Sequence, residues 1–162
     1  MARRKRPYKE GDWFGVPLLN GGHAVGLIAR AGQTGHVLFG YFFGPQGRIL
    51  PGIEALSPLI SEDAIFVGMF SDHALLNNEW PVIGSSPVWD RTQWPLPLFA
   101  RIDEIDNKAF LSQYSEDDPN EVLREESCDI EKARGFPRDR LSGTTALQVH
   151  LTELLSNEKH KK

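Results

Sequence analysis

Three short apolar segments separated by tight turns constrain the fold more than any other feature of the chain. They cover residues 12–19, 23–30 and 36–43, and residues 20–22 and 31–35 lie between them. The first turn has the sequence Asn-Gly-Gly, and Asn-Gly is the strongest short hairpin signal because both central residues tolerate positive φ. Strands joined by so few residues must run antiparallel. The sequence therefore predicts an N-terminal antiparallel meander.

Strand-forming segments continue after the meander, interrupted by proline. Residues 49–60 contain two prolines and predict a loop with at most a short helical turn. Residues 85–98 combine three prolines with two tryptophans, which favours an extended aromatic loop. For residues 120–134 a solvated helix and a long surface loop stay equally open. Further strands are predicted at 64–70, 79–84, 99–102 and 108–114, with a turn or short helix at 72–78.

The clearest helix lies near the C-terminus. Its four leucines, Leu147, Leu151, Leu154 and Leu155, follow the spacing i, i+4, i+7 and i+8, which puts them on one helical stripe. We expect the helix to bury this stripe against the sheet. The predicted fold class is therefore α+β, a mainly antiparallel β-sheet with a C-terminal amphipathic helix packed on it.

The length of the chain suits a single domain over residues 1–162. We expect residues 8–156 to be globular and residues 1–7 and 157–162 to form disordered tails. Cys128 is the only cysteine, which excludes an intramolecular disulfide and a four-thiolate zinc site. The basic N-terminus has no apolar run behind it, and the apolar stretches are only of strand length. These features predict a cytoplasmic protein that does not enter membranes.

Motifs for catalysis or cofactor binding are missing from the sequence. It contains no HExxH, HxH, CxxC, GxGxxG, GxxxxGK or GxSxG pattern. His23 and His36 could face each other across a hairpin, with Asp12 close enough to complete a zinc site, but ordinary polar positions on strands explain them better. We therefore expect no catalytic residue, no metal and no cofactor.

Charge is distributed unevenly along the chain. Residues 1–9 hold five basic residues and no acid, whereas residues 103–131 hold eleven acids against Lys108 and Arg124, a net charge of −9. Such a negative field repels nucleic acid and attracts a basic protein, although a merely solubilising surface is the alternative. On the first interpretation the partner-binding residues are Glu116, Asp117, Asp118, Glu121, Glu125, Glu126, Asp129 and Glu131. The oligomeric state stays open.

The four tryptophans fall into two pairs. Trp13 and Trp80 lie in predicted strands and are expected in the core. Trp89 and Trp94 lie in the proline-rich loop, where they either anchor that loop or serve as aromatic anchors for a partner. The second possibility gives an alternative function of a different class, a non-enzymatic β-rich module that binds a small ligand or a peptide through this loop.

Several segments taken together resemble the immunity protein 26 family. The opening KEGDWFGVPL at residues 9–18 is followed by a turn and by AVGLI at residues 24–28. The later segments EWPVIG at 79–84, WPLP at 94–97 and LSG at 141–143 are also similar. These are strand and turn signatures, so the resemblance supplies no functional residues.

The resemblance covers about residues 8–155 and implies an α+β fold and a protein partner. Members of the family are encoded beside bacterial polymorphic toxins, and each neutralises its toxin by direct binding. The implied partner of this chain is therefore a cognate toxin protein. A nuclease toxin would present a basic surface, which the acidic segment suits.

Overall fold

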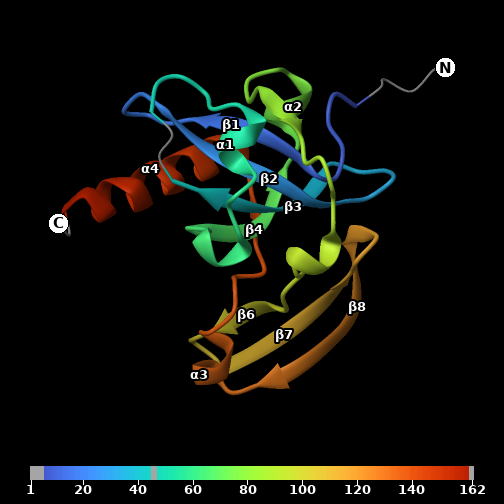
Figure 1. Ribbon diagram of the computed structural model, residues 1–162. Coiled ribbons are helices and arrows are strands. Elements are labelled where there is room, and N and C mark those ends of the chain that lie inside the picture. Colours follow the sequence, from blue (N-terminus) through green and yellow to red (C-terminus); the bar gives the residue numbers. More distant parts are fainter. Residues whose placement is uncertain (1–5, 45–46, 161–162) are drawn as a thin grey trace.

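The computed structural model describes residues 6–44 and 47–160 of the chain. In this part the strands form a six-stranded and a three-stranded sheet, and a long helix follows near the C-terminus (Figure 1). The predicted α+β class is confirmed. In spatial order, the strands of the six-stranded sheet are β5 (Val82–Ser85), β1 (Asp12–Pro17), β2 (His23–Ala31), β3 (Val37–Phe43), β4 (Phe66–Ser71) and β9 (Leu141–Ser142).

The predicted meander is confirmed and extends by one strand. Strands β1 to β4 follow one another in antiparallel pairs, with Trp13 opposite Leu27 and Leu38 opposite Phe70. The turn between β1 and β2 contains Gly21 and Gly22, with φ of 89° and 77°. Such positive φ values cost glycine little, which is why this turn closes so tightly.

Both faces of the six-stranded sheet are buried. Phe14, Ile28 and Phe42 point to one face, whereas Trp13 and Phe39 point to the other, and all five side chains are 2% exposed or less. A strand that is covered on both sides needs apolar residues at every position. This double burial explains why the predicted strands are continuously apolar and do not alternate.

Helix α4 (Thr144–His160) covers the first of these faces. Leu147, Leu151 and Leu155 are buried in the core beneath it, and Leu154 packs at its margin. The predicted leucine stripe is therefore confirmed. The Gln148 amide also donates to the Pro17 carbonyl (3.0 Å), which ties the helix to the end of β1.

The three-stranded sheet consists of β6 (Phe99–Asp103), β7 (Lys108–Ser115) and β8 (Asp118–Cys128), in that order. The prediction of a helix or loop at 120–134 is wrong, because most of this segment is β8, followed only by the short α3 (Ile130–Ala133). Its acidic composition disfavours strands, but pairing with β7 outweighs that preference. An edge strand tolerates charge because both of its faces can reach water.

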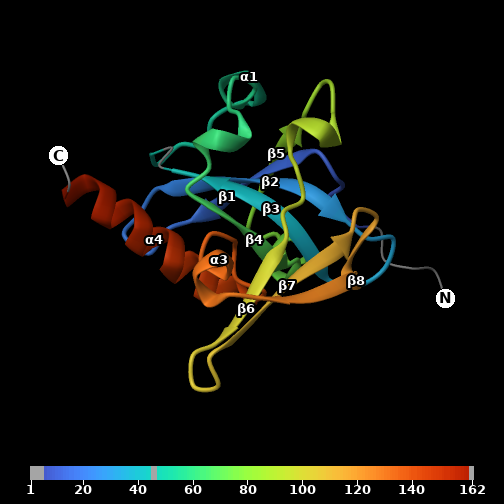
Figure 2. The same cartoon turned by 90° about the horizontal axis from the view of Figure 1, so that it is seen from below.

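One segment joins the edges of the two sheets. Ala100 of β6 donates its N–H to the Pro137 carbonyl (2.7 Å) and accepts from the Asp139 N–H (2.8 Å). A few residues later, Leu141 of β9 pairs in parallel with Met69 of β4. The segment 137–142 therefore fixes the smaller sheet to the larger one. In both views α4 and β8 lie on opposite sides of the molecule (Figures 1 and 2).

The remaining helices are single turns, found in segments where loops or short turns were predicted. They are α1 (Ile53–Leu56), η1 (Ser61–Asp63), α2 (His73–Leu76) and η2 (Arg91–Gln93). None of the helices in the described residues has the length and apolar character that crossing a membrane requires.

The tails predicted at 1–7 and 157–162 fall at the limits of the described residues. Residues 1–5 and 161–162, which include most of the basic N-terminal cluster, lie outside them. The Arg6 guanidinium donates to the carbonyls of Gly32 (2.6 Å) and Gly35 (2.8 Å), and the backbone of α4 continues to His160. Arg6 is thus tied to the turn between β2 and β3.

Candidate partner-binding surface

The eight acidic residues predicted to bind a partner lie on one continuous part of the smaller sheet. They occupy the β7–β8 turn, β8 itself and the start of α3. Asp118 is half-buried and the other seven are exposed. These residues therefore line the outer strand of the smaller sheet and its two ends, and we call them the acidic rim: Glu116, Asp117, Asp118, Glu121, Glu125, Glu126, Asp129 and Glu131.

Arginines pair with five residues of the acidic rim; three of these arginines come from other elements, and two, Arg124 and Arg134, come from β8 and the end of α3. Asp117 lies 2.8 Å from an Arg91 nitrogen, Glu125 lies 2.9 Å from Arg101, and Glu131 lies 2.9 Å from Arg134. Glu116 pairs with Arg30, and Glu126 pairs with Arg124. The net charge counted along the segment therefore overstates the local field. Three rim residues have no ion pair within the described residues: the half-buried Asp118 and the exposed Glu121 and Asp129.

Arg30 is the buried member of this network. It lies near the end of β2, and its side chain is only 2% exposed. The guanidinium donates to the Glu116 carboxylate and to the Ala29 carbonyl (2.6 Å). A buried charge is costly unless it is paired, so Glu116 is held over the end of β2. Sequence reasoning missed Arg30, although a charged residue ending an apolar strand was the available signal.

Arg91 ties the β7–β8 turn to the N-terminal segment. Its guanidinium donates two hydrogen bonds to the Glu10 carboxylate (2.8 and 2.9 Å) and one to Asp117 (2.8 Å). The hydrogen bonds to Glu10, and then to Asp117, raise the pKa of Arg91, so the guanidinium stays charged. The Trp89 indole N–H also donates to Glu10 (3.0 Å).

The aromatic loop is held by the packing of Trp94 on the six-stranded sheet. Trp94 is 8% exposed, and its ring lies 5.2 Å from that of Tyr41 and 5.9 Å from that of Trp13. Trp13 and Trp80 are buried in the core, as predicted. A hollow of about 580 Å³ lies beside Trp94. A ligand-binding function for this loop stays a prediction.

His23 and His36 do not form the zinc site considered from the sequence. In the β2–β3 register Val25 lies opposite Phe43 and Ala31 opposite Leu38, so His23 and His36 lie at opposite ends of the pair. The Nδ1 atom of His36 is instead 3.1 Å from Asp72. Among the side chains that the structure describes, in residues 6–44 and 47–156, no three histidine, cysteine, aspartate or glutamate side chains meet as a metal ion would require.

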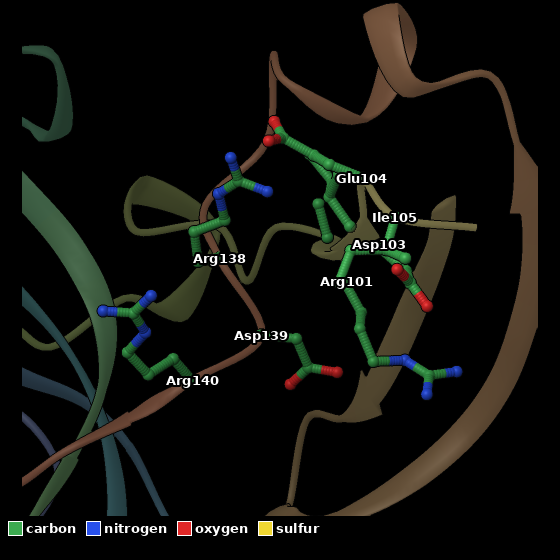
Figure 3. Close-up of a pocket in the computed structure, with 9 residues that line it drawn as sticks. Arg101, Asp103, Glu104, Ile105, Arg138, Asp139 and Arg140 are labelled. Carbon is green, nitrogen blue, oxygen red and sulfur yellow. The ribbon is translucent and has the colours of Figure 1, made fainter. Parts of the chain in front are cut away.

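A second hollow, of about 590 Å³, lies between β6 and the joining segment. Figure 3 shows Arg138 and Arg140 pointing away from the smaller sheet, whereas Asp139 points toward it, where it accepts a hydrogen bond from Tyr114. The lining includes three arginines and three carboxylates, so it favours no ligand of a single sign.

The acidic rim also contains exposed apolar side chains. Val122 and Leu123 of β8 are 47% and 55% exposed. From the sequence, they were expected only as two of the few apolar positions of a possible helix at residues 120–134. Exposed apolar side chains that lie between carboxylates on an edge strand suit contact with another protein.

Removing Glu116 should destabilise the fold through Arg30. The variant Glu116→Ala leaves the buried guanidinium without its carboxylate, and we expect the free energy of unfolding to fall by about 1–3 kcal/mol. The matched control is Glu121→Ala in the same hairpin, which breaks no ion pair and should change stability by less than about 0.5 kcal/mol. Urea denaturation measures both. Equal effects of the two variants would contradict the role given to Arg30.

The burial of three tyrosine side chains predicts that the free energy of unfolding falls at alkaline pH. Burial raises the pKa of Tyr41 to about 12, and burial followed by a hydrogen bond to a carboxylate also raises the pKa of Tyr8 and of Tyr114. Below about pH 10 these phenols are protonated in both the folded and the unfolded chain. Above about pH 10 the unfolded chain releases its protons first, so stability is lost as the pH rises toward 12.

The variant Tyr41→Phe tests this sign. In the native chain Tyr41 should remove up to about 1.4 kcal/mol of stability per pH unit above about pH 10. Without this phenol the decline should be shallower, although the variant also loses the hydrogen bond to Pro95 at neutral pH. Urea denaturation across this pH range measures the slope, and an unchanged slope would refute the assignment to Tyr41.

A family model described as Immunity protein 26 matches residues 9–111, more than half of the chain. No curated protein and no solved structure matches. The matched span is shorter than the span of residues 8–155 expected from the resemblance. It ends within β7 and stops before the acidic rim. It nevertheless includes β1 to β6, and with them nearly all of the six-stranded sheet. The chain belongs to the immunity protein 26 family.

Proposed function

We propose that this chain binds and neutralises a cognate bacterial toxin by direct contact and performs no catalysis itself. The acidic rim is the toxin-facing surface. The observation that carries this placement is the run of eight carboxylates along β8 and the segments that flank it, seven of them exposed. In this proposal the protein works in the cytoplasm, needs no cofactor and does not bind nucleic acid.

Charge complementarity favours a basic partner. A nuclease toxin presents cationic side chains to phosphate, and an acidic inhibitor can occupy that surface. Such complementarity steers the two proteins together and speeds association. Glu121 and Asp129 suit this role best, since both are exposed and no internal arginine neutralises them among the described residues.

The paired carboxylates contribute through their fixed positions. Arg30, Arg91 and Arg101 hold Glu116, Asp117 and Glu125 in place before any partner arrives. A preorganised surface loses less conformational entropy when it binds. The arginines therefore reduce the net charge of the rim but help to fix its pattern, and that pattern is what a specific partner can match.

The extent of the family match also supports this placement. Residues 9–111 identify the family, and the acidic rim begins beyond them at Glu116. The features shared with the family therefore belong mainly to the supporting sheet. A surface that recognises one particular toxin is expected to be individual to the chain.

The first test is complex formation with the toxin domain encoded beside this gene, inactivated so that the cells survive. Co-expression with a tagged copy of this chain should give a stable one-to-one complex in size-exclusion chromatography, and activity of the active toxin should fall on addition of the chain. Failure of the two proteins to co-elute when both are folded would refute the proposed function.

Charge reversal tests the placement of the surface. The double variant Glu121→Lys with Asp129→Lys breaks no ion pair among the described residues, so the fold should be kept. We expect association to slow by about ten-fold or more at low salt, with a weaker dependence on salt. The matched control reverses two exposed acids elsewhere, Glu54 in α1 and Glu153 in α4. If the control slowed association as much, net charge and not the acidic rim would be responsible.

A further inference from the structure

Strand β8 has a long edge without a backbone partner. It runs over eleven residues, and among the described strands it pairs only with β7. No backbone hydrogen bond from another described segment reaches residues 118–128. An exposed strand edge is a template on which another chain can add a strand. The backbone hydrogen bonds show which N–H and carbonyl groups of this edge are free, and the neighbouring side chains show what kind of strand the edge would bind.

The hydrogen bonds of Ala100 show which backbone groups of the smaller sheet point toward β8. Both its N–H and its carbonyl bond to the segment 137–139, so both point away from β7. Ala100 lies directly opposite Leu111. In an antiparallel pair whose groups point outward on one strand, they also point outward on the other. The backbone groups of Leu111 therefore point to β8.

The same alternation continues into β8. Leu111 lies opposite Glu126, so this pair is hydrogen-bonded and the Glu126 backbone faces β7. Neighbouring residues of a strand point to opposite sides, so the N–H and carbonyl groups of Glu125 and Ser127 face the free edge. Toward the turn the register shifts between Gln113 and Tyr114, which ends the regular part of the edge.

The side chains beside this edge select its occupant. Strand β8 carries four carboxylates and one arginine, a net charge of −3. A second copy of β8 would bring carboxylates against carboxylates, which is unfavourable across paired strands. A strand with lysine or arginine would instead meet opposite charge, and its apolar residues could cover the exposed Val122 and Leu123.

We propose that the edge of β8 accepts an extended, basic segment of the toxin as a fourth strand of the smaller sheet. This inference rests on the proposed function and adds its binding geometry. Backbone bonds to Glu125 and Ser127 supply the pairing, and the flanking carboxylates select a basic chain over a second copy of this one.

Residue-resolved amide hydrogen exchange tests the inference with the inactivated toxin domain as the probe. In the free protein the amides of Arg124 and Glu126 should be protected by β7, whereas those of Glu125 and Ser127 should exchange rapidly. In the complex we expect exchange at Glu125 and Ser127 to slow by about a hundred-fold.

The possible outcomes are distinguishable. A complex in which Glu125 and Ser127 still exchange rapidly overturns strand addition but keeps the proposed function. Absence of any complex overturns both. Protection of the same two amides in the free protein at high concentration, with dimers in size-exclusion chromatography, shows that the edge takes a second copy and also overturns the inference.

A pair of substitutions at Ser127 gives an independent readout. Proline removes an N–H that faces the free edge and leaves the ladder with β7 intact, whereas alanine keeps that N–H. We expect Ser127→Pro to raise the Kd for the toxin domain at least ten-fold and Ser127→Ala to leave it nearly unchanged. Equal Kd values for the two folded variants would contradict strand addition, and if the proline variant does not fold, the exchange experiment decides.

Discussion

Burial of both faces of the six-stranded sheet is the constraint on which the rest of the structure depends. Once the central strands are apolar at every position, each face needs its own cover. Helix α4 supplies one cover with a single leucine stripe. The other face is covered by the loops that carry Leu56 and Trp94 and by Phe99 at the start of β6. The smaller sheet is therefore attached to the larger one through its first strand, while β8 is left at the outside.

The arginines connect this core to the surface. Arg30 is buried in the larger sheet but is satisfied by a carboxylate of the smaller one. Arg91 similarly links the N-terminal segment, through Glu10, to the β7–β8 turn. The same carboxylates that we propose for partner binding are thus partly fixed by the fold. The carboxylates that pair inward therefore have fixed positions. Glu121 and Asp129, which have no ion pair in the part of the chain that the structure describes, keep their charge available to a cationic partner.

The sequence predicted the parts of the fold that local patterns determine. The Asn-Gly turn and the apolar strands indicated the meander, and the leucine spacing indicated α4. It could not predict β8, because glutamate-rich residues become a strand only when a partner strand is present, and single-sequence patterns do not show pairing. The pairing of Glu116 with Arg30 joins residues far apart in the chain, so it was equally hidden. The candidate surface was predicted by composition, and its arginine partners were not.

Segment 137–142 has a consequence for how such a protein can diversify. The chain leaves the larger sheet after β5 and forms β6 and the β7–β8 hairpin. Segment 137–142 then bonds to Ala100 of β6 and returns to the larger sheet by pairing with Met69 of β4. The β7–β8 hairpin therefore lies between two supports, β6 and segment 137–142, which are fixed in the fold. Its outer strand can be lengthened, shortened or given another charge pattern while both supports keep their places. The partner that is recognised can then differ between related chains while the fold stays the same.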